Sequence, residues 1–373
     1  MYQNRKSSKK ILFTSHTANF QKFNRPFMHM MREDGWEVHY ASMGEEEILN
    51  CDKSFVVPFT RSPFKLSNIT AYKQLRKIIN QENYDIIHTH TPMGSVVTRL
   101  AAKKARKNGT KIIYTAHGFH FFKGAPLLNW LIYYPVERLM AHHTDTLITI
   151  NKEDYNRAKR QFKTNVTYMP GVGVDPKRFT PKPTAKQKLE LRKSLGLKKD
   201  DFVMIYPAEL SKRKNQLWLI EALRPLLNDD TKVHLILAGK DSLHGKVTQH
   251  VNQYDLANQV HILGYRNDIH QLLQIANLSV SSSKQEGLPV HIMEAMFAGL
   301  PIVTIKCRGA TELVEDGVNG FVVGFDQQEL LQKIEKIRRN PSLSRQLSKQ
   351  SIKLASQYDI KSILSMAEKV YHE

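Results

Sequence analysis

The chain has 373 residues, of which 41% are hydrophobic and 24% charged, a balance typical of two or three folded domains and not of a disordered chain. Its two cysteines, Cys51 and Cys307, exclude a disulfide scaffold, offer no zinc-ligand spacing and suit a reducing compartment. The net charge is +20, and the first 180 residues, with 28 basic and 14 acidic side chains, carry +14 of it. Such an excess indicates an anionic partner (a nucleic acid, a phosphorylated substrate or an anionic membrane), unless it serves solubility alone.

Membrane spans and export signals are not expected. No run of apolar residues reaches the roughly 18 that a spanning helix needs. The basic N-terminus, MYQNRKSSKK, precedes only a short apolar strand, whereas a signal peptide needs a longer apolar region and a cleavage site. We therefore expect a cytoplasmic protein.

Short apolar runs alternate with helical periods along the whole chain. In the first half, the pattern predicts helices over residues 25–34, 70–81 and 94–107, and strands over residues 11–13, 37–40, 86–88, 112–114 and 146–150. In the second half, further helices separate strands predicted over residues 203–205, 233–238, 260–263, 278–281 and 302–305. Strands that alternate with helices form parallel sheets covered on both faces.

Two such series predict two doubly wound α/β domains. The turn-rich stretch 170–176 and the polar stretch 180–187 are the expected linker between them. In doubly wound sheets, ligands bind beyond the carboxyl ends of the strands. We therefore expect the ligand site in a cleft between the two domains.

Residues 281–296 are the most informative segment for chemistry. The strand predicted at 278–281 leads into a polar loop, and Pro289 suits the first turn of a helix. Backbone N–H groups of the loop Glu286-Gly287-Leu288 would then lie at a helix N-terminus, which is an anion site. Glu294 falls inside that helix beside apolar residues, so its carboxylate needs a cation or ligand hydroxyls as a partner. Taken alone, two glutamates on a helix and its loop are more often solvated.

Five motifs in order resemble a known family. Glu286 and Glu294, with Gly-Leu-Pro after the first, are similar to the signature of the retaining GT-B glycosyltransferases of family 4, the glycosyl transferases group 1. The resemblance continues at residues 210–216, 238–240, 264–268 and 317–321. The stretch 115–126, with the sequence TAHGFHFFKGAP, resembles the branch that builds bacterial exopolysaccharide and capsule units.

The resemblance implies an α/β protein of GT-B fold with two Rossmann-like domains facing a cleft. The N-terminal, acceptor-binding domain would comprise residues 1–175 together with a C-terminal crossover helix at 356–373. The donor-binding domain would comprise residues 176–355. The expected reaction moves a sugar, an N-acetylhexosamine or a hexose, from a UDP-sugar to a polyprenyl-diphosphate-linked saccharide.

Site roles carry over by motif position. Glu294 would accept hydrogen bonds from the ribose hydroxyls and Glu286 would orient the donor sugar, while the N–H groups of Gly287 and Leu288 hold the diphosphate or sugar. Lys214 would neutralise the diphosphate as it leaves, a role suited to an ammonium. Otherwise it is one of three clustered solvated cations.

The remaining donor-binding positions are less regular. The family usually has an arginine where this chain has Glu209, so Arg213 or Arg266 would have to supply the second cation. Tyr265 and Arg266 would flank the base, expected to be uracil, and Gly239 follows the next strand of the domain.

In the N-terminal domain, His117 follows the strand at 112–114 and matches the family's histidine near the reacting anomeric carbon. Its alternative is a hydrogen-bonded structural histidine, the role expected of His88 and His90. The loop 14–19, which carries glycines in the family, has none here, so hydroxyl or amide contacts would replace close backbone approach.

No cofactor and no metal are expected. The chain lacks the Asp-x-Asp pair with which metal-dependent transferases hold a divalent cation at a nucleotide diphosphate, and a helix N-terminus and lysine would act in its place. Nor does it offer an obvious carboxylate nucleophile. The resemblance therefore implies retention through a front-side displacement in which the leaving phosphate helps to take the acceptor proton.

Two stretches suggest how the acceptor is reached. Residues 94–111 are helix-like and basic, and residues 119–134 are richer in aromatic and apolar side chains than one buried helix needs; the basic residues are Arg99, Lys103, Lys104, Arg106, Lys107 and Lys111. Together they predict peripheral attachment to an anionic membrane, on its inner face. Alternatively, the aromatic residues are core and the lysines a solvated face.

Three other functions remain open at this point. A GT-B-like sugar-nucleotide epimerase shares the architecture without a lipid acceptor, and a glycogen-synthase-like polymerase would extend a soluble glucan. A nucleic-acid-binding protein would explain the charge, but no helix-turn-helix, RNP or zinc pattern occurs, so no nucleic acid is expected as a partner. Other polysaccharide-assembly enzymes remain possible partners.

Overall fold

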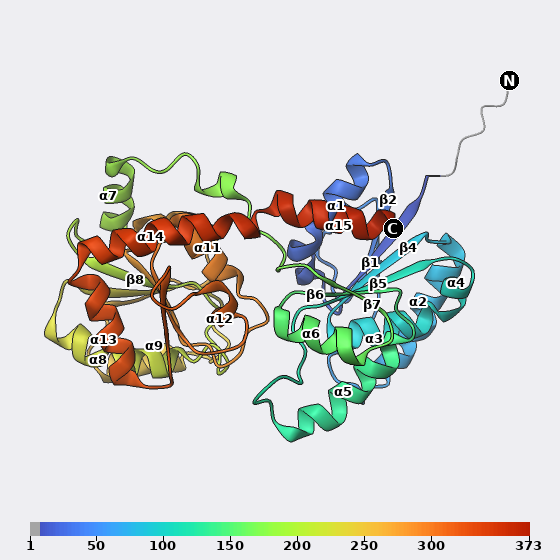
Figure 1. Ribbon diagram of the computed structural model, residues 1–373, viewed down its shortest axis with the longest axis horizontal. Coiled ribbons are helices and arrows are strands. Elements are labelled where there is room, and N and C mark those ends of the chain that lie inside the picture. The colour runs from blue at the N-terminus through green and yellow to red at the C-terminus, as the bar shows by residue number, and fades with distance from the viewer. Residues whose placement is uncertain (1–7) are drawn as a thin grey trace. The chain divides into compact units, whose positions relative to one another are not determined.

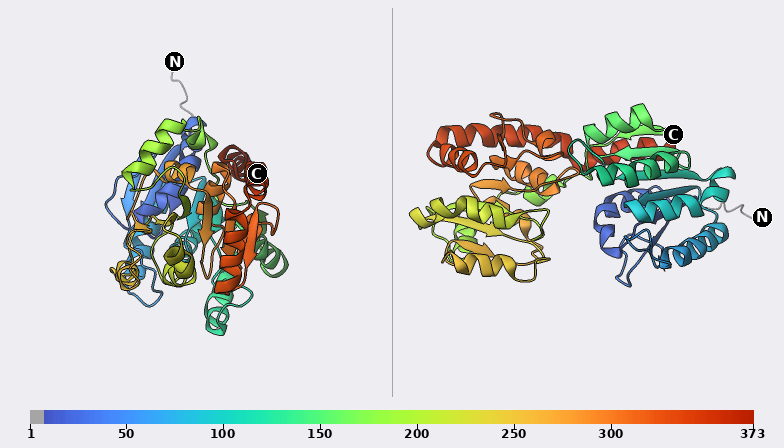
Figure 2. Two further views of the ribbon diagram at one scale, coloured as in Figure 1. Left: turned by 90° about the vertical axis from the view of Figure 1, so that its left-hand side faces the viewer. Right: turned by 90° about the horizontal axis from the view of Figure 1, so that it is seen from below.

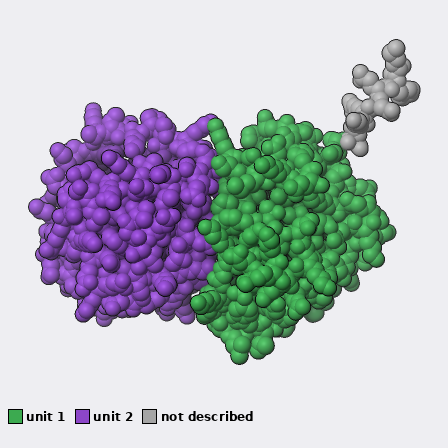
Figure 3. Space-filling view, in the orientation of Figure 1, with its two compact units in different colours: residues 1–172, 360–373 green, residues 173–359 purple. Residues whose placement is uncertain are grey.

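The structure, a computed structural model, describes residues 8–373 and divides into two compact units (Figures 1 and 3). Unit 1 comprises the chain up to Val172 together with Ile360–Glu373, and unit 2 comprises Gly173–Asp359. The divisions expected from the sequence, after residues 175 and 355, lie a few residues from these. Most of the basic N-terminal stretch, which we do not expect to be a signal peptide, falls outside the described residues.

Unit 1 is built on a parallel sheet of seven strands in the order β3-β2-β1-β4-β5-β6-β7. Neighbouring strands are parallel throughout, with Leu12 of β1 opposite Ile87 of β4. The strands are β1 (Lys10–Thr14), β2 (Glu37–Ser42), β3 (Lys53–Val56), β4 (Ile86–His90), β5 (Lys111–Ala116), β6 (Thr146–Thr149) and β7 (Asn165–Tyr168).

Helices cover both faces of this sheet because successive side chains of a strand point to opposite sides. Ile11 packs with α1 and α15, whereas Leu12 packs with α2 and α3. The C-terminal helix α15 thus belongs to the core of unit 1 although it follows unit 2 in the chain. The helices are α1 (Gln21–Glu33), α2 (Ser67–Glu82), α3 (Pro92–Ala101), α4 (Lys103–Lys107), α5 (Leu127–Ala141), α6 (Lys152–Gln161) and α15 (Ile360–His372), with the 3-10 turn η1 (Ala18–Phe20).

Unit 2 is a second parallel sheet, of six strands in the order β10-β9-β8-β11-β12-β13. This order reverses direction between β8 and β11, as in dinucleotide-binding folds. The strands are β8 (Phe202–Tyr206), β9 (Val233–Leu237), β10 (Val260–Ile262), β11 (Leu278–Ser281), β12 (Ile302–Ile305) and β13 (Gly320–Val323).

Helices again lie on both faces of the sheet of unit 2, as Figures 1 and 2 show. Contacts join α8 to α9 and α13, and join α11 to α10 and α14. A capping box between Thr184 and Gln187 starts α7, and Gly299 at φ +77° ends α11. The helices are α7 (Ala185–Ser194), α8 (Gln216–Asp229), α9 (Lys246–Gln253), α10 (Ile269–Ile275), α11 (Val290–Ala298), α12 (Ala310–Leu313), α13 (Gln327–Arg338) and α14 (Pro341–Ala355), with η2 (Pro176–Phe179) and η3 (Ser356–Tyr358).

The predicted α/β class with two doubly wound domains is confirmed, and every predicted strand is present. The helix expected over residues 94–107 is wrong in one respect, because it consists of two helices, α3 and α4. Among residues 8–373, no helix combines the length and the apolar character needed to cross a bilayer.

Candidate functional site

The order of strands in unit 2 reverses between β8 and β11, which are neighbours in the sheet. In open α/β sheets, ligands bind outside the carboxyl ends of the strands at such a point. Lys214 lies in the loop from β8 to α8, and Glu286 lies in the loop from β11 to α11. The topology therefore brings together two residues that are far apart in the sequence.

These two residues form a buried ion pair. Lys214 Nζ lies 2.5 Å from Glu286 Oε1, and only 8% and 7% of the two residues is exposed. Arg213 Nη1 lies 3.0 Å from Glu286 Oε2, and the Ser283 hydroxyl donates to Glu286 Oε1 over 2.5 Å. We call these four residues, Arg213, Lys214, Ser283 and Glu286, the Lys–Glu cluster.

The charges of the cluster explain the ionisation of its carboxyl. Burial acts to raise the pKa of Glu286, but the nearby cations, above all Lys214, outweigh burial and lower this pKa to about 2. Glu286 is therefore a carboxylate at neutral pH. A buried site that holds two cations around one carboxylate has a positive balance, which suits an anionic ligand.

The backbone around the cluster is fixed by hydrogen bonds between the two loops. The N–H of Lys284 donates to the Arg213 carbonyl over 2.9 Å. The Tyr206 hydroxyl and the Ser282 hydroxyl donate to the Lys214 carbonyl over 3.1 and 2.9 Å. The backbone that carries the Lys214 ammonium is consequently anchored by hydrogen bonds on both sides of the site.

Glu294 has a cationic partner that the sequence did not reveal. Its side chain, on α11, is 12% exposed, and its Oε1 accepts a hydrogen bond of 2.7 Å from Arg178 Nη1. Arg178 belongs to η2, more than a hundred residues earlier in the chain. The sequence required a partner for this carboxylate, but no local signal could identify Arg178.

The other predicted donor-binding residues are placed as follows. Glu209 is exposed, and its carboxylate accepts a hydrogen bond from Ser242. Arg266 forms a bidentate ion pair with Asp268, in which Nε lies 2.8 Å from Oδ1 and Nη2 lies 2.6 Å from Oδ2. Tyr265 is 71% exposed. Of the two arginines offered as the second cation, the structure places Arg213, and not Arg266, in contact with Glu286.

Two positions beside the site, Gly239 and Gly309, need glycine for close packing. A Cβ on Gly239 would lie 2.1 Å from the Ala208 carbonyl oxygen, so a larger residue does not fit beside β8. The carbonyl of Gly287 packs against Gly309, where a Cβ would come within 2.3 Å of it. Leu288 is buried directly before Pro289, the N-cap of α11, so the loop 286–288 leads into the N-terminus of this helix.

In unit 1, His117 follows β5 and contacts a second histidine. Its Nε2 lies 3.1 Å from Nδ1 of His90, at the end of the neighbouring strand β4. His88 bonds the Tyr371 hydroxyl of α15 over 2.7 Å. Burial lowers the pKa of His117 to about 4 and that of His88 to about 3, so both imidazoles are neutral at pH 7. His90, which the sequence indicated only as a structural histidine, is thus the direct neighbour of His117, and no local signal indicated Tyr371 as the partner of His88.

The prediction that Arg99 belongs to an exposed basic patch is wrong. This side chain is 1% exposed, forms an ion pair of 2.9 Å with Glu137 and stacks on the Tyr114 ring at 4.2 Å. Tyr114 also donates to Glu137 over 3.0 Å. Arg99 therefore connects α3 to α5 inside unit 1, because a carboxylate distant in sequence compensates its buried charge. Exposed cations remain on α4: Lys103, Lys104 and Lys107.

The predicted aromatic segment divides into a buried and an exposed part. Phe119 and Phe121 are core residues, 2% and 0% exposed, so their assignment to a lipid-facing surface is wrong. The helix that follows, α5, instead exposes a row of large apolar side chains. They are Leu127, Leu128, Leu131, Ile132, Val136 and Leu139, with exposed fractions of 40% to 74%, and we call them the α5 apolar face.

Residues with metal-binding chemistry also gather in unit 1. Among residues 8–373, two groups of three potential ligands lie close together: Asp34, Glu368 and His372, and Glu37, His39 and Glu82. Neither group contains a member of the Lys–Glu cluster. In the second group, Glu37 and Glu82 are already paired with Lys10.

The fold and the site at its switch point define a class, the two-domain GT-B proteins. Known structures support this class. HepE of Anabaena, in complex with UDP and glucose, aligns with a TM-score of 0.80 at 23% identity over 98% of this chain and all of that chain. WaaG, described as a glycosyltransferase involved in lipopolysaccharide biosynthesis, aligns with a TM-score of 0.77 at 18% identity over 96% of this chain and 99% of that chain.

The chain belongs to the glycosyl transferases group 1. That family model matches residues 187–354, and the model "Glycosyl transferase 4-like" matches residues 10–151. A relative from Bacillus subtilis (strain 168), EpsD, provisionally described as a glycosyltransferase, is 40% identical over 97% of this chain and 96% of its own. A second relative, the UDP-Gal:alpha-D-GlcNAc-diphosphoundecaprenol alpha-1,3-galactosyltransferase of Escherichia coli, is 28% identical over 73% of this chain and 70% of its own. The protein is a glycosyltransferase.

Proposed function

We propose that this glycosyltransferase moves a hexose or N-acetylhexosamine from a UDP-sugar to a polyprenyl-diphosphate-linked saccharide, in exopolysaccharide or capsule biosynthesis. The observation that carries the proposal is the buried Lys–Glu cluster at the switch point of unit 2, because its cations suit a diphosphate. The acceptor class is supported by relatives named as acting on diphosphoundecaprenol-linked sugars in Escherichia coli and Campylobacter jejuni.

On the donor side, Lys214 and Arg213 would neutralise the diphosphate, and the N–H groups of Gly287 and Leu288 would hydrogen-bond its oxygens or the sugar. Glu286 would orient the sugar hydroxyls. Glu294 would accept hydrogen bonds from the ribose while Arg178 keeps hold of it, since one carboxylate offers about four acceptor positions.

We further propose retention without a metal ion. The bond between the anomeric carbon and the diphosphate oxygen breaks, and the acceptor hydroxyl oxygen forms its bond on the same face of the sugar. The departing phosphate takes the hydroxyl proton, and the cations of the Lys–Glu cluster stabilise the charge that develops on it. We propose, as the resemblance implies, that His117 contacts the donor near the anomeric carbon. A covalent glycosyl adduct trapped on a carboxylate would refute this mechanism.

We propose that the α5 apolar face inserts into the interfacial region of an anionic membrane that carries the acceptor. Arg106 of α4 donates to the His142 carbonyl, directly after α5, over 2.8 Å, so the exposed lysines of α4 lie near the end of this helix. Apolar side chains beside cations are the composition of an interfacial helix.

Vesicle co-sedimentation tests this attachment. Leu128→Ser with Leu131→Ser should release the protein from vesicles that contain anionic lipid. Leu66→Ser is the matched control, because Leu66 is 78% exposed but lies outside α5. Equal binding of both variants would contradict insertion of α5.

The test of the activity is a donor screen with purified protein. We expect UDP release from one UDP-sugar, dependent on a lipid extract that contains polyprenyl-diphosphate sugars, and unchanged by EDTA. Lys214→Ala and Glu294→Ala should abolish this release, whereas Lys212→Ala, an exposed neighbour, should not. Release of UDP without lipid, together with an altered free sugar, would replace the proposal by an epimerase. Repeated extension of a soluble glucan would replace it by a polymerase.

A further inference from the structure

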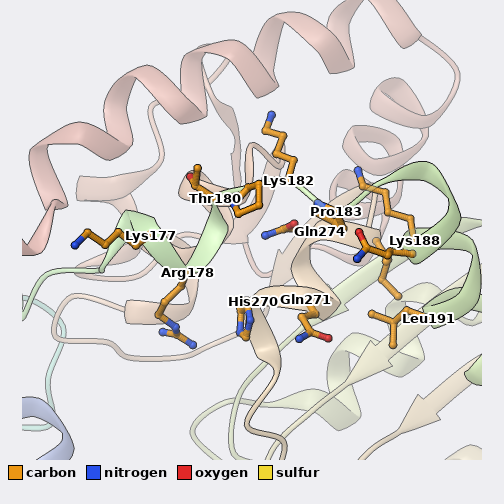
Figure 4. A pocket seen from close by; sticks show the side chains of 13 residues that line it. Lys177, Arg178, Thr180, Lys182, Pro183, Lys188, Leu191, His270, Gln271 and Gln274 are labelled. Atoms are coloured by element: carbon orange, nitrogen blue, oxygen red, sulfur yellow. The ribbon is translucent and has the colours of Figure 1, made fainter.

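Unit 2 carries a groove that is formed by other residues than the Lys–Glu cluster. It has a volume of about 490 Å³ and lies between the segment 177–191 and helix α10, and Figure 4 shows its lining side chains. No member of the Lys–Glu cluster lines it. The groove has the volume of a site for a small metabolite.

The groove carries an excess of positive charge, although one of its cations, Arg178, is paired with Glu294. Four cationic side chains line it, Lys177, Arg178, Lys182 and Lys188, and no aspartate or glutamate is among its lining residues. Lys188 is half-buried; burial lowers its pKa, and the like charges of Lys182 and Arg192 lower it further. A bound anion would offset this repulsion.

The uncharged side chains that line the groove offer hydrogen-bonding groups suited to a carbohydrate or to a similar polar group. The amides of Gln271 and Gln274 and the Thr180 hydroxyl can donate to and accept from hydroxyl groups, whereas the Gln187 carbonyl oxygen is held in the capping box with Thr184. Nδ1 of His270, which also lines the groove, is buried, and in the described part of the chain it has no hydrogen-bond partner. In the view of Figure 4, Gln271 and Gln274 lie between Arg178 and Lys188, so amide and cationic side chains line the same groove.

We propose that this groove binds a phosphorylated small molecule. Its phosphate would contact Lys182 and Lys188, and the polar groups of the rest of the molecule would hydrogen-bond to the glutamine amides. The proposal goes beyond the transferase activity, because it assigns unit 2 a ligand in addition to the donor. It also predicts a link to the donor site, because Arg178 lines the groove and holds Glu294.

Titration calorimetry on the full chain tests the proposal with two probes, glucose 6-phosphate and inorganic pyrophosphate. Saturating UDP is present throughout, so that the proposed donor site is occupied. We expect at least one probe to bind and Lys182→Gln with Lys188→Gln to weaken this binding at least about tenfold, the effect of losing one charge-assisted hydrogen bond. Titration with glucose 6-sulfate separates phosphate recognition from general attraction of anions: the sulfate should bind more weakly.

The matched control is Lys186→Gln with Lys193→Gln. It removes the same charge, and both residues are exposed on α7 and do not line the groove. Equal weakening in both double variants would overturn the proposal, because it would show a response to net charge alone. Absence of binding by both probes, or equal binding of the sulfate, would also overturn it.

Failure of the groove and failure of the proposed function are distinguishable. If UDP itself does not bind, the proposed donor site fails, but the comparison of the two double variants still reports on the groove. If the probes bind only without UDP and Lys214→Ala abolishes their binding, they occupy the Lys–Glu cluster and the groove proposal is wrong.

Discussion

The substitution Lys214→Met tests how much the buried ion pair stabilises unit 2. Methionine keeps most of the side-chain length and volume but removes the charge. Lowering the pKa of Glu286 from 4.5 to about 2 corresponds to about 3 kcal/mol of favourable interaction with the carboxylate form. Lys214 is the largest of the lowering influences, whereas Arg213 and Ser283 remain in the variant. We therefore expect a loss of about 2–3 kcal/mol in the free energy of unfolding, somewhat below the 3–5 kcal/mol typical of breaking a buried pair.

The assay is urea unfolding with hydrogen exchange read from peptides of unit 2, so that the two units are followed separately. Glu286→Gln and the double variant complete a double-mutant cycle. Because the double variant buries no charge, it should be more stable than the sum of the single losses predicts, with a coupling of about 2 kcal/mol. Lys212→Met is the control, and we expect it to change stability by less than about 0.5 kcal/mol because Lys212 is exposed.

The pH dependence gives a second readout. The folded pKa of Glu286 is depressed, so its stabilising contribution is fully present above pH 4.5 and is lost as the pH falls toward 2. The difference between wild type and Lys214→Met should be constant near pH 7 and shrink below pH 4.5. A loss no larger than that of the Lys212 control, or an additive cycle, would refute the reasoning.

Two further substitutions test the interior of unit 1. Arg99→Met leaves Glu137 buried without its cation and should lower the free energy of unfolding in urea by about 3–5 kcal/mol. The control Arg106→Met breaks an ion pair that is about one-third exposed and should lower it by less than about 1 kcal/mol. Similar losses in the two variants would contradict this interpretation. Tyr371→Phe removes the hydrogen-bond partner of His88 and should destabilise unit 1 by about 1–3 kcal/mol, measured by thermal unfolding. An unchanged midpoint temperature would show that this hydrogen bond does not hold α15 in place.

The strands missed from the sequence, β3, β7 and β13, are all edge strands. An edge strand is covered less than a central one: β3 and β7 have no buried residue, and Lys53 of β3 is exposed. The sequences of β3 and β7 therefore lack the continuous apolar run that marks a central parallel strand, whereas β13 is mostly buried and its apolar run is only three residues long. Local hydrophobicity predicts the centre of a sheet better than its borders.

The site shows a similar limit. The positions of Lys214 and Glu286 at strand ends could be predicted from the sequence, but the bond between them depends on β8 and β11 being neighbours. The same holds for Arg99, which looked like part of a basic helix surface and is instead neutralised by Glu137, 38 residues later. Residue type and local period carry no information on such partners, because only the tertiary fold brings them into contact.

The position of Glu209 bears on how two cations can suffice at the proposed diphosphate site. Its carboxylate bonds Ser242 within the neighbouring loops, so it supplies no positive charge where the family usually has an arginine. Arg213 can supply it because its side chain is 46% exposed and its contacts are with Glu286 and a loop carbonyl. On the proposed function, Arg213 turns from Glu286 to the diphosphate when the donor binds, while Lys214 and Ser283 keep the carboxylate ionised.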